Sequence, residues 1–261
     1  MSDQEKLAKK FHKMMGAFYV NADMDETTDV GSFGTLKRDL YVEENTSIQN
    51  YFGVQVQTEV RGSGGGMTFS SQGDISISVK ITGSLDGSNG VRATAIDAGV
   101  PVTANMSETS KYSGSVSITF HRANAYILSF SNYIVEQLTN ERAVNDEIVQ
   151  LYKEPPHNDW RKEFAIVTAA RIAESGLIIM SKKKSLTVNF DAEVTSDSSA
   201  NFSIGQELSL SEIQNVGLTA SGGLALNTAD AIQWVLPENC TPIVELKKLK
   251  GYGNNLRLDR L

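Results

Sequence analysis

The sequence has a single cysteine, Cys240, and no long apolar run. One cysteine can form no internal disulfide, which favours a reducing compartment. No segment reaches the roughly 18 consecutive apolar residues that predict a transmembrane helix, and residues 1–16 lack the apolar core of a secretory signal. We therefore expect a protein that is cytoplasmic when inactive, and we expect its Asn-X-Ser/Thr sequons to be chance matches: Asn45, Asn105, Asn201 and Asn239.

Motifs for catalysis are also missing. The three histidines, His12, His121 and His157, lie far apart and in no metal-ligand spacing. There is no P-loop and no Gly-X-Ser-X-Gly nucleophile motif, and the glycine run RGSGGG (Arg61–Gly66) precedes no helix N-terminus that could bind phosphate. We therefore expect neither an enzyme nor a cofactor.

The acidic segment DMDETTD (Asp23–Asp29) superficially resembles the start of a calcium-binding loop. Thr28 stands where such a loop needs a glycine, and Gly34 stands where it needs a bidentate glutamate. We therefore expect no metal site in this segment.

Positive charge is absent from one long part of the chain. Ser185–Leu246 contains no lysine or arginine and eight acidic residues, in a chain of net charge −7. Both ends are basic: residues 2–16 carry four lysines, and residues 247–260 carry three lysines and two arginines. This polarity predicts that one end approaches an anionic surface, although ordinary solvated faces can carry the same pattern.

What the sequence has in abundance is alternation of polar and apolar residues. Ser185–Ile204 reads SLTVNFDAEVTSDSSANFSI, in which every odd-numbered residue is polar and most even-numbered residues are apolar. A period of two predicts a strand with one dry and one wet face. The run is far longer than a usual strand of about 5–6 residues.

Two blocks of the chain are rich in β-prone sequence. The first block, residues 67–121, alternates in two long runs. The second block, residues 163–204, begins with Phe164–Met180, which leads through SKKK (Ser181–Lys184) to the run quoted above. We predict a strand pair in each block, with SKKK as a four-residue hairpin connection. Both faces of Phe164–Met180 are apolar, so we expect this strand to be buried.

The segment between the blocks, residues 122–160, has helical spacing. We predict helices there because apolar residues recur every three or four positions: Ile127, Phe130, Ile134 and Leu138, then Val144, Ile148 and Leu151. Shorter runs predict strands at Gly53–Val60, Ala231–Leu236 and about Ile243–Leu249.

The N-terminus carries a helix signal. Ser2 and Glu5 form a Ser-X-X-Glu capping box. The residues that follow form one apolar stripe, flanked by lysines: Leu7, Phe11, Met14 and Met15. Short basic amphipathic helices of this kind lie in membrane interfaces, drawn by anionic headgroups. The alternative is that the stripe packs on the domain's own surface.

Alternating strands of this length are compatible with a membrane. A strand that crosses a bilayer needs about 9–11 residues with one lipid-facing side. A membrane-spanning sheet must also be closed, so many copies would have to join edge to edge. The serine- and threonine-rich polar face favours this interpretation. The alternative is a soluble sandwich with one face on its core and one in water.

The order of these elements resembles the gasdermin pore-forming domain over nearly the whole chain. The most recognisable runs are EFAIVTAARIAESGLIIMSKKKSLTVNF and GLTASGGLALNTADAIQWVLPENCTPIVELKKLK. They are similar to the family's second hairpin and to the strands that close its domain. The resemblance implies a single α+β domain, residues 1–261, whose twisted and mostly antiparallel sheet has surrounding helices and two long extension hairpins. Its parts would be a basic amphipathic helix (1–16), a first hairpin (67–121), a helical middle (122–160), a second hairpin (163–204), and closing strands with a basic tail (205–261).

Gasdermins bind acidic lipids, oligomerise and refold two hairpins into a transmembrane β-barrel, which causes lytic cell death. For this sequence the resemblance implies a lipid-binding set of Lys6, Lys9, Lys10, Phe11, Lys13 and Met14. It implies a lipid face of the hairpins made by Ile75, Ile77, Val79, Ile81, Val116, Ile118, Phe120, Leu186, Val188 and Phe190. The lumen face would include Lys80, Asp191, Glu193 and Asp197, and the tip that anchors in the far headgroups would be Lys182, Lys183 and Lys184.

The sequence departs from parts of the family. We expect no separate inhibitory domain of the kind that animal gasdermins carry, and there is no cysteine near residue 1, where bacterial relatives often carry a lipidated one. The sequence is therefore most similar to the small fungal regulator-of-cell-death type, with the bacterial type as second choice and an active fragment of a longer protein as another possibility. The expected partners are an acidic phospholipid membrane and copies or variants of the same family, with no nucleic acid. The alternative function is a soluble β-rich interaction module without membrane activity.

Overall fold

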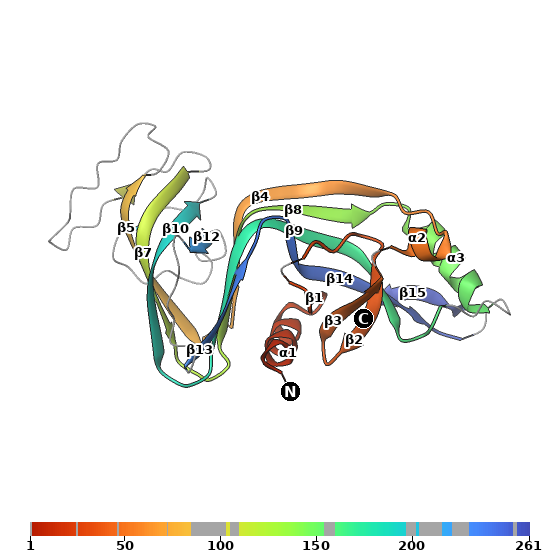
Figure 1. The fold of residues 1–261 in the computed structure, drawn as a ribbon, viewed down its shortest axis with the longest axis horizontal. Coiled ribbons are helices and arrows are strands. Elements are labelled where there is room, and N and C mark those ends of the chain that lie inside the picture. Colours follow the sequence, from red (N-terminus) through yellow and green to blue (C-terminus); the bar gives the residue numbers. More distant parts are fainter. Residues whose placement is uncertain are drawn as a thin grey trace. The chain divides into compact units, whose positions relative to one another are not determined.

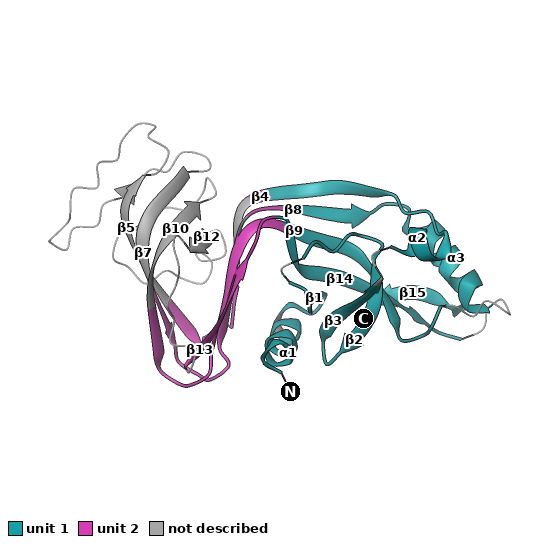
Figure 2. Ribbon diagram, in the orientation of Figure 1, with its two compact units in different colours: residues 1–63, 134–172, 239–261 teal, residues 64–133, 173–238 magenta. Residues whose placement is uncertain are grey.

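Figure 1 shows the computed structural model of the chain, which describes residues 2–24, 26–45, 47–71, 73–84, 103–104, 110–153, 160–196, 202–203, 216–220, 230–252 and 255–261. The chain divides into two compact units (Figure 2). Unit 1 comprises residues 1–63, 134–172 and 239–261, and unit 2 comprises residues 64–133 and 173–238. Within the described ranges, no helix is both long and apolar enough to cross a membrane.

Helix α1, Asp3–Met15, begins at the predicted capping box. The Glu5 N–H donates to Ser2 Oγ (3.1 Å), and the Ser2 N–H donates to Glu5 Oε2 (2.8 Å). These bonds satisfy two N–H groups that a helix start leaves without an intrahelical partner. The helix ends at Gly16, whose positive φ of 63° favours a residue without a side chain.

The sheet of unit 1 contains β1 (Phe18–Asn21), β2 (Phe33–Lys37), β3 (Leu40–Asn45), β14 (Cys240–Lys250) and β15 (Arg257–Arg260). Its order is β15-β14-β1-β3-β2, and it continues through β9 (Phe164–Ser181) and β8 (Tyr126–Leu138) to β4 (Thr58–Ser70). β1 and β3 are parallel, whereas β1–β14, β14–β15, β2–β3 and β2–β9 are antiparallel. The predicted last strand is therefore present as β14.

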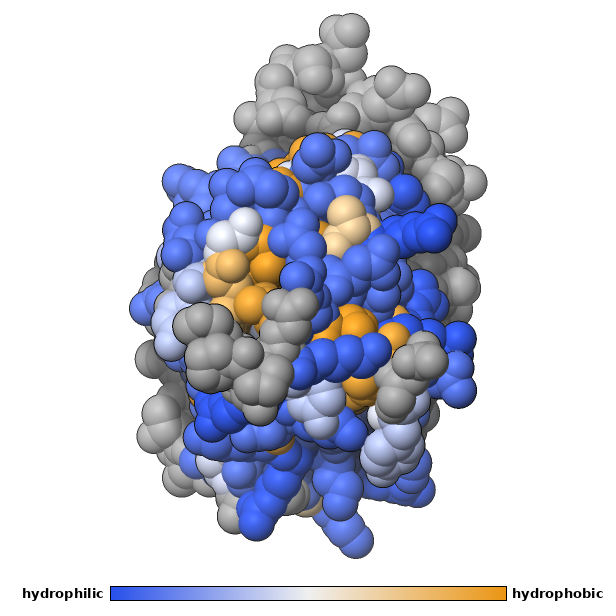
Figure 3. Space-filling view, turned by 90° about the vertical axis from the view of Figure 1, so that its right-hand side faces the viewer, coloured by the Kyte–Doolittle hydropathy of each residue, from blue (hydrophilic) through white to orange (hydrophobic). Residues whose placement is uncertain are grey.

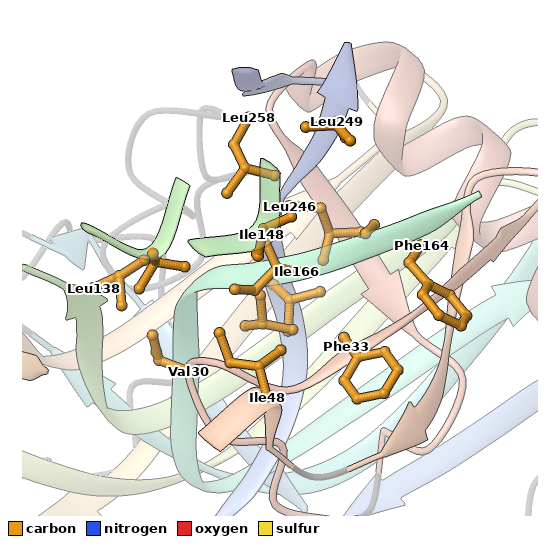
Figure 4. Close-up of a cluster of buried hydrophobic side chains, with 14 of the residues drawn as sticks. Val30, Phe33, Ile48, Leu138, Ile148, Phe164, Ile166, Leu246, Leu249 and Leu258 are labelled. Carbon is orange, nitrogen blue, oxygen red and sulfur yellow. The ribbon is translucent and has the colours of Figure 1, made fainter. Parts of the chain in front are cut away.

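Two further helices belong to unit 1: α2 (Ile48–Phe52) and α3 (Glu141–Lys153). Val144 and Ile148 of α3 are fully buried in the core, where they join Phe33, Ile166 and Leu246 (Figure 4). The helical spacing predicted for this part of the middle segment is thus confirmed. The outer surface at the end of the molecule that carries α2 and α3 is mainly hydrophilic, with small apolar patches between the polar side chains (Figure 3).

Besides a short strand pair, the described part of unit 2 contains two groups of paired strands. One is the end of the nine-stranded sheet and is made by β4, β8 and β9, with β13 (Ala231–Leu236) antiparallel to the last part of β9. The other has the order β12-β10-β7-β5, made by β5 (Ile75–Ser84), β7 (Ser110–Phe120), β10 (Leu186–Ser196) and β12 (Val216–Ala220). A short pair joins β6 (Thr103–Ala104) to β11 (Phe202–Ser203). The observed fold is thus mixed and sheet-dominated, and the strand predicted at Ala231–Leu236 is confirmed.

The prediction of helices throughout residues 122–160 was wrong in its first half. Tyr126–Leu138 is the strand β8, and helix begins only at Glu141. The side chains of residues 126–130 are all buried, so the strand carries apolar residues on both faces. When both faces of a strand are apolar, its apolar residues recur at many spacings, including the three- and four-residue spacings of a helix. The length of the segment did not distinguish the strand from a helix here. The strand predicted at Gly53–Val60 begins only at Thr58.

The prediction that β9 and β10 form a hairpin across SKKK was also wrong. β10 pairs with β7 on one side and β12 on the other, whereas β9 pairs with β2 and β13 and lies beside β8. The predicted burial of Phe164–Met180 is confirmed, because 13 of the 18 residues of β9 form two buried runs at its ends. A strand buried on both faces shows no alternation, so the sequence gives no indication of its partners.

Candidate functional site

The ten residues predicted to form an apolar hairpin face lie in register across three strands of unit 2. Three cross-strand rows contain nine of them: Ile75–Phe120–Leu186, Ile77–Ile118–Val188 and Val79–Val116–Phe190. Ile81, the tenth, pairs with Gly114. Residues opposite one another in a sheet project from the same face. The rows therefore form one apolar face over β5, β7 and β10.

This apolar face is buried near its start. Ile118 and Phe120 have no exposed surface, Val188 is 3% exposed and Ile75 is 8% exposed. The side chains of Ile77, Val79, Ile81, Val116 and Phe190 lie outside the described part of the structure. In this conformation these four side chains are therefore packed inside the protein, whereas Leu186 is half-buried.

The intervening residues form a polar face. Ser76–Thr119–Thr187 and Ser78–Ser117–Asn189 are its first two rows. The hydroxyls of Thr119 and Thr187 lie 3.1 Å apart and form a cross-strand hydrogen bond. Lys80 and Asp191 both pair with Ser115, and Glu193 pairs with Ser113 and Thr219. These lumen-face candidates therefore share the polar register, while Asp197 falls outside the described residues.

The three strands have the length of membrane-crossing strands. β5 has 10 residues, and β7 and β10 have 11 each. A strand tilted in a bilayer needs about 9–11 residues to cross it. These three strands therefore combine a shared register, an apolar face and a length that is sufficient to cross a bilayer.

Four chain connections meet where these strands begin. The described residues of these connections are Ser71, Gly73–Asp74, His121–Ala125, Lys182–Ser185 and Asp230. We name this set of residues the crease. The Asn124 N–H donates to the Ser181 carbonyl (2.7 Å), the His121 N–H to the Asp74 carbonyl (2.7 Å), and the Lys182 N–H to the Asp230 carbonyl (2.8 Å). The connections are therefore hydrogen-bonded to one another or to the strand ends beside them.

The crease joins two sheets with matching strand order. On one side the order is β4-β8-β9-β13, and on the other it is β5-β7-β10-β12. Three strands continue across the crease into the strand at the same place in the other sheet: β4 into β5, β8 into β7, and β9 into β10. β12 and β13 occupy the fourth place in their sheets and are consecutive in the chain. The two sheets are thus one four-stranded ribbon that doubles back at the crease, and Figure 1 shows the chain reversing there.

This ribbon was not predicted from the sequence. Each break in the alternation did leave a signal, because polar or glycine-containing segments interrupt the strands at SSQGD (Ser70–Asp74), HRAN (His121–Asn124) and SKKK. Such clusters mark turns and bends. The sequence does not show that these three segments lie next to one another, because their positions follow from pairing between strands that are distant in the chain. Lys182, Lys183 and Lys184 consequently lie at the crease and not at the tip of a β9–β10 hairpin.

Two ion pairs bridge connections of the crease. Arg122 Nε lies 3.3 Å from Asp74 Oδ1, and Lys183 Nζ lies 2.5 Å from Asp230 Oδ2. The basic partners are well exposed, with side-chain exposures of 74% for Arg122 and 53% for Lys183. Exposed pairs of this kind contribute about 0–1 kcal/mol each, so these two ion pairs add little to the stability of the crease.

Helix α1 presents its predicted cations but not its predicted apolar contact. Lys9 and Lys13 are exposed, Lys10 is half-buried, and Lys6 pairs with Asp3 (2.8 Å). Phe11 is completely buried, so in this conformation it cannot contact lipid as the resemblance implied. The stripe packs on the domain's own surface, the alternative considered for this helix. The side chain of Met14 is outside the described part of the structure.

Polar contacts hold α1 on unit 1. His12 Nδ1 lies 3.2 Å from the Phe18 carbonyl, and its ring stacks on Tyr19 with centroids 4.2 Å apart. Arg38 Nη1, in the turn after β2, lies 3.1 Å from Glu5 Oε2. A backbone hydrogen bond from Ser2, helped by Arg38, lowers the pKa of the Glu5 carboxyl.

The acidic segment Asp23–Asp29 takes part in a buried hydrogen-bond network. Asn21 Nδ2 donates to Thr28 Oγ1 (2.8 Å), and Thr28 Oγ1 donates to Glu43 Oε2 (2.9 Å). Burial raises the pKa of the Glu43 carboxyl, with Asp23 and Asp29 adding to the effect and hydroxyls opposing it. No group of three potential metal ligands occurs among the residues that the structure describes.

No protein-family model and no curated protein matches this chain. Among solved structures, a chain of the gasdermin A3 membrane pore is similar, with 8% sequence identity and a TM-score of 0.34. The match covers 98% of this chain and 93% of that chain.

Proposed function

We propose that this chain is a pore-forming protein that binds acidic membranes from the cytoplasm and inserts the sheet made by β5, β7, β10 and β12 into them. It is cytoplasmic when inactive and lies in a cell or organelle membrane when assembled. Copies of the chain, or copies together with an allelic variant, form a large transmembrane β-barrel, and the resulting leak causes lytic cell death of the kind used in fungal allorecognition. The protein is not an enzyme in this account.

The observation that carries the proposal is the register of β5, β7 and β10. Three rows of apolar residues alternate with rows of polar residues over the first five positions of the three-strand register, in strands of 10 or 11 residues. A transmembrane β-barrel needs this combination of one lipid-facing face, one water-facing face and this length. A soluble sheet with one face on its core would also alternate, but its strands would not need to be long enough to cross a bilayer.

The number of strands implies oligomerisation. The second sheet of unit 2 has four strands, with β5 and β12 at its edges. An open edge cannot remain in hydrocarbon, because its backbone N–H and C=O groups would have no partners. The edges of one copy must therefore pair with those of its neighbours until the sheet closes.

The polar register carries charges of both signs. Asp191 and Glu193 occupy polar-register positions on β10, Lys80 occupies one on β5 and Lys111 occupies one on β7. These four charges cancel, so the cation preference that the sequence predicts depends on Asp197, the next acidic residue after Glu193.

Dye release tests the proposal. Purified protein, alone or with a variant of the same family, should release an entrapped dye from vesicles that contain phosphatidylserine or cardiolipin, and should leave phosphatidylcholine vesicles sealed. If both kinds of vesicle stay sealed with every partner and after limited proteolysis, the pore-forming function is rejected.

The second candidate function is a soluble interaction module. The complete burial of Ile118 and Phe120 favours it, because these side chains already have a protein environment. This candidate predicts that acidic vesicles leave hydrogen exchange in Leu186–Ser196 unchanged. The pore-forming account predicts that exchange in this strand changes on vesicles and that the change accompanies dye release.

A further inference from the structure

We propose that the crease is a second binding site for anionic phospholipid headgroups, in the leaflet from which the ribbon enters the membrane. The site is separate from helix α1 and forms when the strands beyond the crease insert. This inference rests on the proposed function. It assigns a binding partner to the cations of the crease, which belong neither to the apolar rows nor to the polar rows.

Positive charge in unit 2 is concentrated at the crease. The unit contains seven lysines and arginines: Lys80, Arg92, Lys111, Arg122, Lys182, Lys183 and Lys184. Four of these seven lie in the crease. The alternating strands beyond it hold few cations, and Leu186–Ser196 holds none. A chance distribution over the unit would not place most of its cations in four short connections.

The crease has acidic groups, but too few to neutralise its cations. Asp74 faces Arg122, and Asp230 faces Lys183. Four cations against these two carboxylates leave a net charge of +2 before His121 is counted. Lys182, Lys183 and Lys184 are all exposed, as are His121 and Arg122. The cluster is therefore accessible to an anion of the size of a phospholipid headgroup.

The position of the cations relative to the apolar face indicates interfacial depth. The first apolar row, Ile75–Phe120–Leu186, begins two residues from Arg122 and two residues from Lys184. Two residues of strand rise about 7 Å, which is within the reach of lysine and arginine side chains. When this row lies at the edge of the hydrocarbon, the cations lie among the headgroups, where long basic side chains are most stable.

The same geometry fixes the leaflet. The three strands run away from the crease for 10 or 11 residues, a full bilayer crossing. The chain connects unit 1 to the crease through β4, β8 and β9, and we propose that these strands remain outside the bilayer. The crease lysines therefore bind the near leaflet and do not cross the bilayer, contrary to the assignment as a far-side tip that the family resemblance implied.

Vesicles with an asymmetric lipid distribution test this inference. The probe is a vesicle whose phosphatidylserine is confined to the outer leaflet, with protein added outside. The test variant carries Lys182→Ser and Lys184→Ser, two exposed lysines of the crease. The matched control carries Arg142→Ser and Lys153→Ser, two exposed cations of α3, so both variants lose the same charge. Circular dichroism and urea unfolding establish that each is folded, and Lys184→Ser alone serves if the double variant is not.

We expect the protein concentration for half-maximal dye release to rise about 30-fold in the crease variant, because each of the two cations at an anionic surface contributes about fivefold. The α3 control should shift much less. If the crease variant matches wild type on these vesicles, or is impaired only when the inner leaflet also carries phosphatidylserine, a near-leaflet site is rejected. Absence of dye release by wild type instead rejects the proposed function itself.

A free anion is the other source of the same phosphate chemistry. Isothermal titration of inorganic phosphate into the protein without vesicles should show no saturable binding that the crease variant loses. Such binding would assign the crease to a soluble phosphate ligand and overturn the lipid assignment.

Discussion

Val188 lies directly opposite Ile118 in the β7–β10 pair, and both side chains are buried. They come from segments that are distant in the sequence, and they sit near the middle of the apolar face. If the sheet that contains β7 and β10 inserts as proposed, lipid replaces the protein around both side chains. Each strand position beside them belongs to the polar face.

A cation placed on the apolar face should block insertion. We expect Val188→Lys to weaken dye release by about 5- to 30-fold, because a lysine on the lipid face costs about 2–4 kcal/mol at the bilayer midplane and less toward the interface, and Val188 lies in the second row from the crease. Thr187→Lys, the neighbouring substitution on the polar face, should retain activity. Since Val188 is buried, unfolding in urea must show that the variant folds; Val188→Thr replaces it if not. Equal loss of activity at both positions contradicts the two-faced ribbon.

Reversal of the exposed charge on α1 should weaken membrane binding. Lys9→Glu with Lys13→Glu is expected to lower sedimentation with phosphatidylserine vesicles by at least about 30-fold, because each cation contributes about 1 kcal/mol at an anionic surface. Arg142→Glu with Lys153→Glu is the control of equal charge change. Unaltered binding by the α1 variant would assign membrane recognition to another surface.

The buried carboxyl of Glu43 should make stability depend on pH. Burial raises its pKa in the folded protein above the unfolded value of about 4.3. Any stability contributed by this group is therefore fully present below the unfolded pKa and is lost as pH rises through the folded pKa. Relative to Glu43→Gln, the wild type should become less stable in urea unfolding as the pH rises above 4.5 and through the raised pKa of this carboxyl. A constant difference across this range, with Glu238→Gln as the exposed control, would contradict the burial of an ionisable group there.

Gly34 should tolerate no side chain. A Cβ at this position would overlap the Val42 carbonyl oxygen and approach Glu43 Cα to 2.8 Å, at an irregularity in the β2–β3 pairing. Because the obstacle is backbone, Gly34→Ala should destabilise the protein by about 1–3 kcal/mol or more in chemical unfolding. Gly62→Ala, where a Cβ meets nothing within 4 Å, should have little effect. Similar stability of the two variants would show that the strand pair can shift.

The local features that were predictable from the sequence are those set by neighbouring residues. The capping box of α1 forms as Ser2 and Glu5 predict. The alternation around Ile118 and Val188 correctly assigned residues to one face, because side chains of a strand alternate regardless of what the strand pairs with. The helical spacing of Val144 and Ile148 was also correct.

The features that were not predictable depend on contacts between distant segments. Tyr126 and Phe130 lie in a strand buried on both faces, which removes the alternation that identifies strands. The pairing of Leu186 with Phe120, in place of a residue of β9, is set by the way the ribbon doubles back at the crease. The location of Lys182–Lys184 followed from that pairing, so it was assigned to a hairpin tip.

The most direct test of the ribbon is a cysteine scan of β10. Single cysteines at successive positions from Leu186 to Ser196, in a Cys240→Ala background, are labelled with an environment-sensitive fluorophore and measured with phosphatidylserine vesicles. The account predicts that labels at Leu186, Val188, Phe190, Ala192 and Val194 report hydrocarbon, while labels at the intervening positions report water. A uniform environment along the strand, or no change on adding vesicles, would contradict the claim that this sheet inserts into membranes.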